Sequence, residues 1–164
     1  MTSIRSTAKH VLEICRTRGW RVATAESCTG GLVAAALTEI AGSSDVVDRG
    51  FVTYSNEAKA EMLGVPLSTL KRYGAVSAQT AKAMAAGALK NSHADLAVSI
   101  TGIAGPGGGT KQKPVGLVHF AAVRRDGRSV ARKKLFGPVG RSRVRQLSVV
   151  EALKMLETLA RSVR

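Results

Sequence analysis

Thr24-Ala25-Glu26-Ser27-Cys28-Thr29-Gly30-Gly31 joins two apolar segments, Val22-Ala23 before it and residues 32–40 after it. This pattern predicts a strand, a tight turn and a helix. The glycines allow the backbone to approach a ligand closely, and the first N–H groups of the helix would be free and carry a partial positive charge. The stretch therefore predicts a turn that binds an anion or an oxyanion. A capped turn without chemistry is the alternative, and these eight residues alone do not separate the two.

The remainder of the chain alternates between helix and strand patterns. Helices are predicted over residues 6–18, 32–40, 56–62, 66–73, 78–90 and 140–161, with Ser77 as an N-cap. Strands are predicted over residues 20–25, 50–54, 96–100, 115–123 and 129–136, the last two joined by a hairpin at Asp126-Gly127. Alternating strands and helices predict a layered α/β fold, and the hairpin makes its sheet mixed. Because neither a repeat nor a linker interrupts the pattern, residues 1–164 are expected to form one domain.

Three predicted strands end in residues that can do chemistry. These ends are Glu26-Ser27, Tyr54-Ser55 and Thr101-Gly102. In open α/β sheets, ligands bind beyond the carboxyl ends of the parallel strands. We therefore expect the three ends to meet at one site.

Composition limits the classes of protein that this chain can belong to. Two cysteines in 164 residues give no disulfide framework, and no apolar run reaches the ~20 residues of a membrane span, so a cytoplasmic protein without a membrane partner is expected. The net charge of +14 attracts anions. Nine basic residues and one acid lie between Arg124 and Arg145, but Phe136 is the only aromatic residue there. This scarcity disfavours stacking on nucleic-acid bases, and a solvated basic surface is the simpler interpretation.

The side chains offer few metal ligands and leave a lysine as a possible base for a serine. The histidines at 10, 93 and 119 are scattered without zinc spacing and offer no catalytic triad. Lys59 lies one turn into a helix after Tyr54 and is a possible base for Ser27. To act as a base it must lose its proton, through burial or through crowding by cations such as Arg141 and Arg145. From the residues alone, an ordinary surface lysine remains the favoured interpretation. The glycine-rich segment 101–109 matches neither the phosphate-loop nor the dinucleotide fingerprint.

Several motifs together resemble one known family. They are the stretches at residues 24–31, 50–59 (Gly-Phe-Val-Thr-Tyr-Ser-Asn-Glu-Ala-Lys), 74–77, 101–108 and 113–116. The chain resembles, over residues 6–159, the C-terminal domain of the competence-induced protein CinA, the nicotinamide-nucleotide amidohydrolase (NMN deamidase) family, in its stand-alone form. The resemblance implies a three-layer α/β/α sandwich around a mixed, mostly parallel sheet. It also implies hydrolysis of nicotinamide mononucleotide (NMN) to nicotinate mononucleotide and ammonia in pyridine-nucleotide salvage, with no metal or cofactor, by a homodimer.

The resemblance also assigns roles to residues. Ser27 and Lys59 correspond to the family's serine and lysine pair, and Tyr54 is expected close by as a third catalytic residue that could orient Lys59 or pass a proton. Arg141 and Arg145 correspond to the family's arginine motif, where they suit a phosphate. The remaining residues expected to bind substrate are Thr29, Gly30 and Gly31 in the turn and Thr101, Gly102 and Gly105 in the glycine-rich segment. Gly140 departs from the family pattern, in which relatives often have Asp or Asn before the first arginine.

Two other functions remain open from the sequence. The first is a non-catalytic nucleotide-binding or nucleic-acid-binding module linked to competence or DNA damage, which the charge permits but no helix-turn-helix or aromatic-rich sheet supports. The second is a cysteine amidase that uses Cys28, for which no suitable histidine lies nearby in the sequence.

Overall fold

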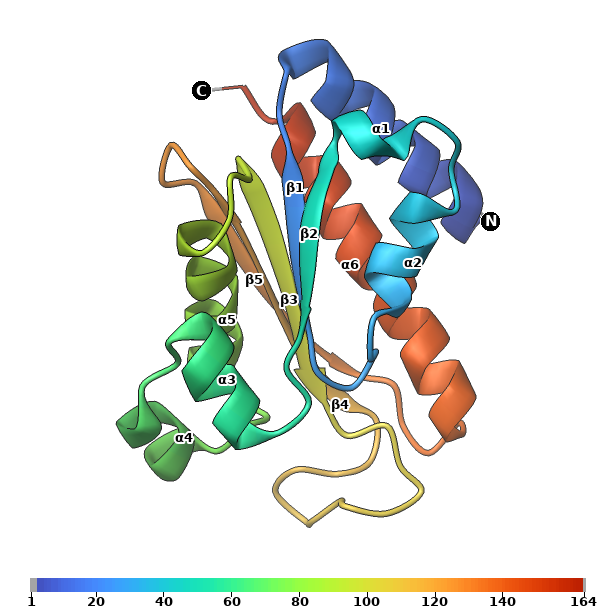
Figure 1. Cartoon of the computed structure of the whole chain (residues 1–164). Helices are drawn as coiled ribbons and strands as arrows, with labels where there is room; N and C mark the ends of the chain where they lie inside the picture. The colour runs from blue at the N-terminus through green and yellow to red at the C-terminus, as the bar shows by residue number, and fades with distance from the viewer. Residues whose placement is uncertain (1–2, 164) are drawn as a thin grey trace.

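A five-stranded sheet with the order β2-β1-β3-β4-β5 forms the centre of the computed structural model, which describes residues 3–163 (Figure 1). Its strands are β1 (Val22–Glu26), β2 (Val47–Val52), β3 (Leu96–Gly102), β4 (Leu117–Arg124) and β5 (Ser129–Leu135). β1 pairs in parallel with both β2 and β3, whereas β4 is antiparallel to both β3 and β5. Every strand except β4 thus points the same way, as expected for a mixed, mostly parallel sheet.

Helices cover both faces of this sheet, so the predicted three-layer α/β/α sandwich is confirmed (Figure 1). One face carries α1 (Ile4–Arg18), α2 (Leu32–Thr38) and α6 (Arg141–Arg161). The other face carries α3 (Asn56–Leu63), α4 (Leu67–Tyr73) and α5 (Ala78–Lys90). A short 3-10 helix, Ser43–Asp45, leads into β2. Among residues 3–163, no helix combines the length and the apolar character that crossing a membrane would require.

The core is built from aliphatic side chains and alanine, as the scarcity of aromatic residues predicts. The larger aliphatic residues pack between the sheet and α1, α2 and α6, where Cys15 is also buried. On the other face, α5 presents small residues and packs closely against the end of α3. A Cβ atom at Gly87 of α5 would lie only 2.0 Å from the Leu63 backbone oxygen. Gly87 therefore allows α3, which carries Lys59, to pack closely against α5.

Most predicted elements are present, but several boundaries differ. β2 runs over Val47–Val52 rather than residues 50–54, because it pairs with β1 from Val22 to Glu26 and ends where β1 ends. α1 begins at Ile4 because the Ser3 hydroxyl caps it, and α2 ends at Thr38, two residues early. The predicted Ser77 cap is confirmed, since its hydroxyl accepts a hydrogen bond from the Thr80 N–H.

Candidate active site

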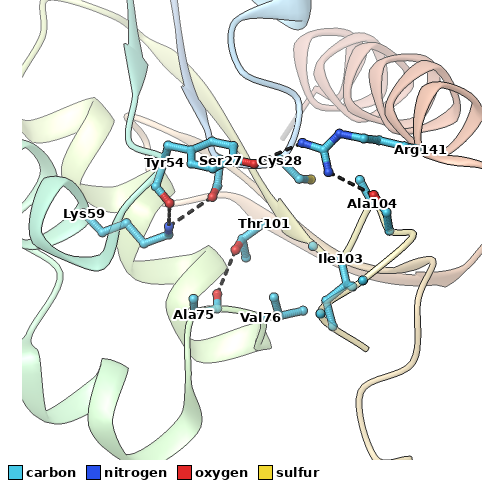
Figure 2. Close-up of a pocket in the computed structure, with 14 residues that line it drawn as sticks. Ser27, Cys28, Tyr54, Lys59, Ala75, Val76, Thr101, Ile103, Ala104 and Arg141 are labelled. Carbon is cyan, nitrogen blue, oxygen red and sulfur yellow. Dashed lines mark hydrogen bonds between the residues drawn. The ribbon is translucent and has the colours of Figure 1, made fainter. Parts of the chain in front are cut away.

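The three chemically interesting strand ends meet at one pocket of ≈ 270 Å³ at the carboxyl edge of the parallel strands (Figure 2). Ser27 follows β1, Tyr54 follows β2, and Thr101 and Gly102 end β3. The other lining residues come from the turn after β1, from α3, from the segment before α5, from the glycine-rich loop after β3 and from the start of α6: Cys28, Lys59, Ala75, Val76, Ile103, Ala104, Gly105, Gly107, Gly108 and Arg141. The parallel topology therefore produces the predicted convergence.

Ser27 and Lys59 are in direct contact at this pocket. The Lys59 Nζ lies 3.0 Å from the Ser27 Oγ and 3.1 Å from the Tyr54 backbone oxygen (Figure 2). It also lies 3.0 Å from the Thr53 backbone oxygen. A neutral amine can donate to both carbonyl groups and still accept the serine proton on its lone pair. The geometry thus suits an amine that takes a proton from Ser27.

Burial lowers the pKa of Lys59 below its ordinary value of 10.5. The residue is only 1% exposed, and a low-dielectric environment disfavours the charged ammonium. Of the two causes that were expected, burial and crowding by cations such as Arg141 and Arg145, burial lowers this pKa. Lys59 is therefore not the ordinary surface lysine that the residues alone favoured.

Tyr54 and Arg141 lie at the rim of the pocket. The Tyr54 side chain is 62% exposed, and its hydroxyl accepts a hydrogen bond of 3.1 Å from the Arg141 Nη2 (Figure 2). The Arg141 Nη1 donates to the Gly105 backbone oxygen at 3.0 Å. Tyr54 thus meets Lys59 through its backbone oxygen, whereas its phenol group lies beside the arginine that begins α6.

The turn after Ser27 differs from its prediction because the Glu26 carboxylate binds the first N–H groups of α2. The buried Glu26 carboxylate accepts hydrogen bonds from the Val33 N–H at 2.8 Å, the Ala34 N–H at 3.1 Å and the Thr29 hydroxyl at 2.6 Å. The expectation that these helical N–H groups would be free for a ligand is therefore wrong. Within residues 3–163, the backbone N–H of Cys28 donates no hydrogen bond to another residue.

Not all the residues expected to bind substrate line the pocket. Thr101, Gly102, Gly105 and Arg141 line it, and the Thr101 hydroxyl also donates to the Ala75 backbone oxygen at 2.8 Å. The others lie outside the lining: Thr29, Gly30, Gly31 and Arg145. The sequence interpretation gave no role to Glu26 or to the Ala75-Val76 wall, although both belong to motifs that carry the family resemblance.

Acidic, histidine and cysteine side chains do not gather at this pocket. Across residues 3–163, no group of three or more of these side chains is placed to hold a metal ion. The basic side chains that line the pocket are those of Lys59 and Arg141. The arrangement suits nucleophilic attack on a carbonyl group by a serine, together with binding of an anionic part of the ligand at the rim.

Cys28 is expected to be dispensable for this chemistry. Burial raises the pKa of its thiol to about 11, so the reactive thiolate is scarce at neutral pH. We expect Cys28→Ser to retain kcat within about fivefold, because a serine preserves the size of the side chain and leaves the backbone N–H in place. Steady-state rates of the purified variant provide the measurement, and an inactive Cys28→Ser with an intact fold would restore the cysteine amidase alternative.

Comparisons with known proteins show the family to which the chain belongs. The family described as "CinA C-terminal domain" matches residues 4–160. "Nicotinamide-nucleotide amidohydrolase PncC" of Escherichia coli K12 is 51% identical over 149 residues, which cover 91% of this chain and 90% of that protein. A protein of the same name from Enterobacter agglomerans is 58% identical over 121 residues, 74% of each chain. The crystal structure of the competence/damage inducible protein CihA from Agrobacterium tumefaciens has a TM-score of 0.94 and 55% sequence identity, and the match covers 95% of this chain and 94% of that one.

Proposed function

The chain belongs to the CinA C-terminal domain family, and we propose that it is a nicotinamide-nucleotide amidohydrolase, which converts NMN and water to nicotinate mononucleotide and ammonia. One observation carries the proposal: a buried Ser27–Lys59 pair opens onto the pocket of a chain that shares 51% identity, over almost its whole length, with a protein named for this activity. The finer proposal is that Ser27 is the nucleophile and Lys59 the general base.

In the first half of the reaction, the Ser27 Oγ displaces the nitrogen of the carboxamide. The neutral Lys59 amine accepts the proton of the Ser27 hydroxyl as Oγ forms a bond to the carboxamide carbon. The carbonyl oxygen becomes an oxyanion, and the Cys28 N–H next to the nucleophile donates to it. As this intermediate collapses, the C–N bond breaks and the Lys59 ammonium returns its proton to the leaving nitrogen. Ammonia departs and an ester remains on Ser27.

In the second half, water releases the acid. Lys59, again neutral, accepts a proton from a water molecule as the water oxygen bonds to the ester carbon. The bond between that carbon and the Ser27 Oγ then breaks, and Lys59 returns the proton to Oγ. The product leaves as a carboxylate and one proton is released to solvent. The same amine thus acts as base and acid in turn, which requires a pKa lower than that of an exposed lysine.

Much of the basic sequence between Arg124 and Arg145 makes contacts within the protein, which lowers support for nucleic-acid binding. Arg124 donates to the backbone oxygens of Leu159 and Ser162 at the end of α6, and Arg132 pairs with Glu151. These arginines stabilise the fold, and Arg141 at the pocket rim is the one that we assign to the phosphate of NMN.

Arg141→Met is expected to raise KM for NMN by about 10- to 100-fold while leaving kcat largely unchanged, because a hydrogen-bonded charge contributes about 1.5–3 kcal/mol to binding. Nicotinamide riboside lacks the phosphate, so its KM should change little. Arg143→Met is a matched control, since this exposed arginine of the same helix makes no hydrogen bond or ion pair within residues 3–163. Equal losses on both substrates would contradict the assignment of Arg141 to the phosphate.

Release of ammonia from NMN tests the function itself. The purified protein is incubated with NMN, and ammonia is measured with a coupled enzyme, with nicotinamide and NAD as comparison substrates. We expect rapid release from NMN and little from the other two. Absence of ammonia with NMN, from a folded protein, would overturn the proposal.

A further inference from the structure

Two charged residues hold the turn after Ser27, and neither lines the pocket. Glu26, the last residue of β1, accepts hydrogen bonds from the Thr29 hydroxyl in the turn and from two N–H groups at the start of α2. Arg145 binds it from α6, in contact with two successive backbone oxygens. These contacts with the protein backbone differ from the phosphate binding that the arginine motif suggests for Arg145.

The contacts of Arg145 fall on the two residues that follow the nucleophile. Its Nε donates to the Cys28 backbone oxygen at 3.1 Å and its Nη2 to the Thr29 backbone oxygen at 3.3 Å. The guanidinium group also lies against Gly30, where an added Cβ would be 3.5 Å from Nη2. The planar fork of an arginine suits two neighbouring acceptors, which the point charge of a lysine cannot engage in the same way.

These contacts fix the orientation of the peptide groups around Ser27. In a trans peptide the carbonyl and the next N–H point in opposite directions, so holding the Cys28 oxygen also orients the Thr29 N–H. The Gly30 N–H donates back to the Ser27 oxygen at 3.0 Å, and the Ser27 N–H donates to the Ile100 oxygen at 2.9 Å. The turn is thereby tied to β3, to α2 and to α6, and Ser27 projects from it toward Lys59.

We propose that Arg145 is a positioning residue, which holds the turn so that Ser27 stays in register with Lys59, and that it is not a ligand of the substrate phosphate. This inference rests on the proposed function in so far as Ser27 is the nucleophile. A positioning residue acts on kcat for every substrate, whereas a phosphate ligand acts on KM for NMN alone.

Kinetics of Arg145→Met, Arg145→Lys and the control Arg143→Met separate these roles. We expect Arg145→Met to lower kcat by about 100-fold on both NMN and nicotinamide riboside, with KM for NMN changed by less than about threefold, because a misplaced nucleophile loses rate at unchanged affinity. Arg145→Lys should recover part of this loss, since an ammonium can still reach one backbone oxygen. Arg143→Met should stay within about twofold of the wild type.

A second readout does not depend on NMN. A fluorophosphonate that labels activated serines is added to each variant below its melting temperature, and labelling of Ser27 is followed by intact mass. We expect Arg145→Met to slow the labelling by about 100-fold and Arg143→Met to leave it unchanged. Labelling at the wild-type rate in Arg145→Met, or a selective rise in its KM for NMN, would overturn the inference. A wild-type Ser27 that resists the probe would overturn it as well, because the turn would then present no activated serine.

The same pair of readouts distinguishes this inference from the proposed function. If the wild type releases no ammonia from NMN but Ser27 is labelled, the substrate assignment fails and the comparison of labelling rates still decides the role of Arg145. If Arg145→Met does not fold, Arg145→Lys keeps the charge and supplies the same comparison, with an expected loss smaller than 100-fold but larger than that of Arg143→Met.

Discussion

Ser27→Ala is expected to lower kcat for NMN by about 10⁴-fold or more, since removing the nucleophile of a serine hydrolase removes nearly all of its chemical acceleration. The fold should be retained, because the backbone of Ser27 makes the contacts that hold the turn, through its N–H to Ile100 and its oxygen to Gly30. KM or Kd for NMN should change little. Ammonia release under single-turnover conditions and binding of NMN by calorimetry provide the two measurements.

Cys28→Ser is the matched control for this variant, since it changes the neighbouring side chain in the same turn. An active Ser27→Ala combined with an inactive Cys28→Ser would show that the thiol, and not the hydroxyl, attacks the amide. Residual activity of Ser27→Ala within about tenfold of the wild type would also contradict the mechanism, since an alanine offers no atom for the covalent intermediate.

Lys59→Met and Lys59→Arg are expected to be almost equally inactive, with kcat lowered by at least about 10³-fold. Methionine fills much of the buried space but cannot accept a proton, and arginine keeps both the charge and the proton at any accessible pH. Lys59→Met should still bind NMN, because the proposed role of Lys59 is proton transfer. Turnover of Lys59→Arg close to that of the wild type would contradict the proposed serine and lysine pair.

The pH dependence provides a separate test of Lys59. Because burial lowers its pKa, kcat/KM for the wild type should rise with pH as the amine loses its proton, at a pH below the ordinary 10.5. The folded protein then binds fewer protons than the unfolded chain in the window between the lowered pKa and 10.5, so the free energy of unfolding of the wild type rises with pH across that window. The measurement is denaturation of the wild type and of Lys59→Met at several pH values. The free energy of unfolding of the wild type should rise relative to that of the variant as pH rises. The opposite trend would show that the Lys59 pKa is not lowered.

The sequence alone was sufficient to predict the order of the helices and strands and most of their ends to within about two residues. Apolar periodicity and capping residues act over a few residues, so Ser77, the Asp126-Gly127 hairpin and the strand, turn and helix around Ser27 were all predictable. The boundary of β2 was not, since its start and end depend on pairing with β1 rather than on its own residues.

The candidate site, like the fold, could be predicted only in part from the sequence. The sequence named Ser27 and Lys59 as possible partners, but only packing brings together residues that are 32 positions apart, and only burial by α3 and α5 distinguishes Lys59 from a surface lysine. The hydrogen-bond partners of the charged residues near the turn depend even more on tertiary structure. The Glu26 carboxylate accepts a hydrogen bond from the start of α2, and Arg145 donates one to the Cys28 oxygen, 117 positions away in the sequence. Hydrogen-bond partners at such separations depend on how helices pack on the sheet, and local sequence patterns carry no information about that packing.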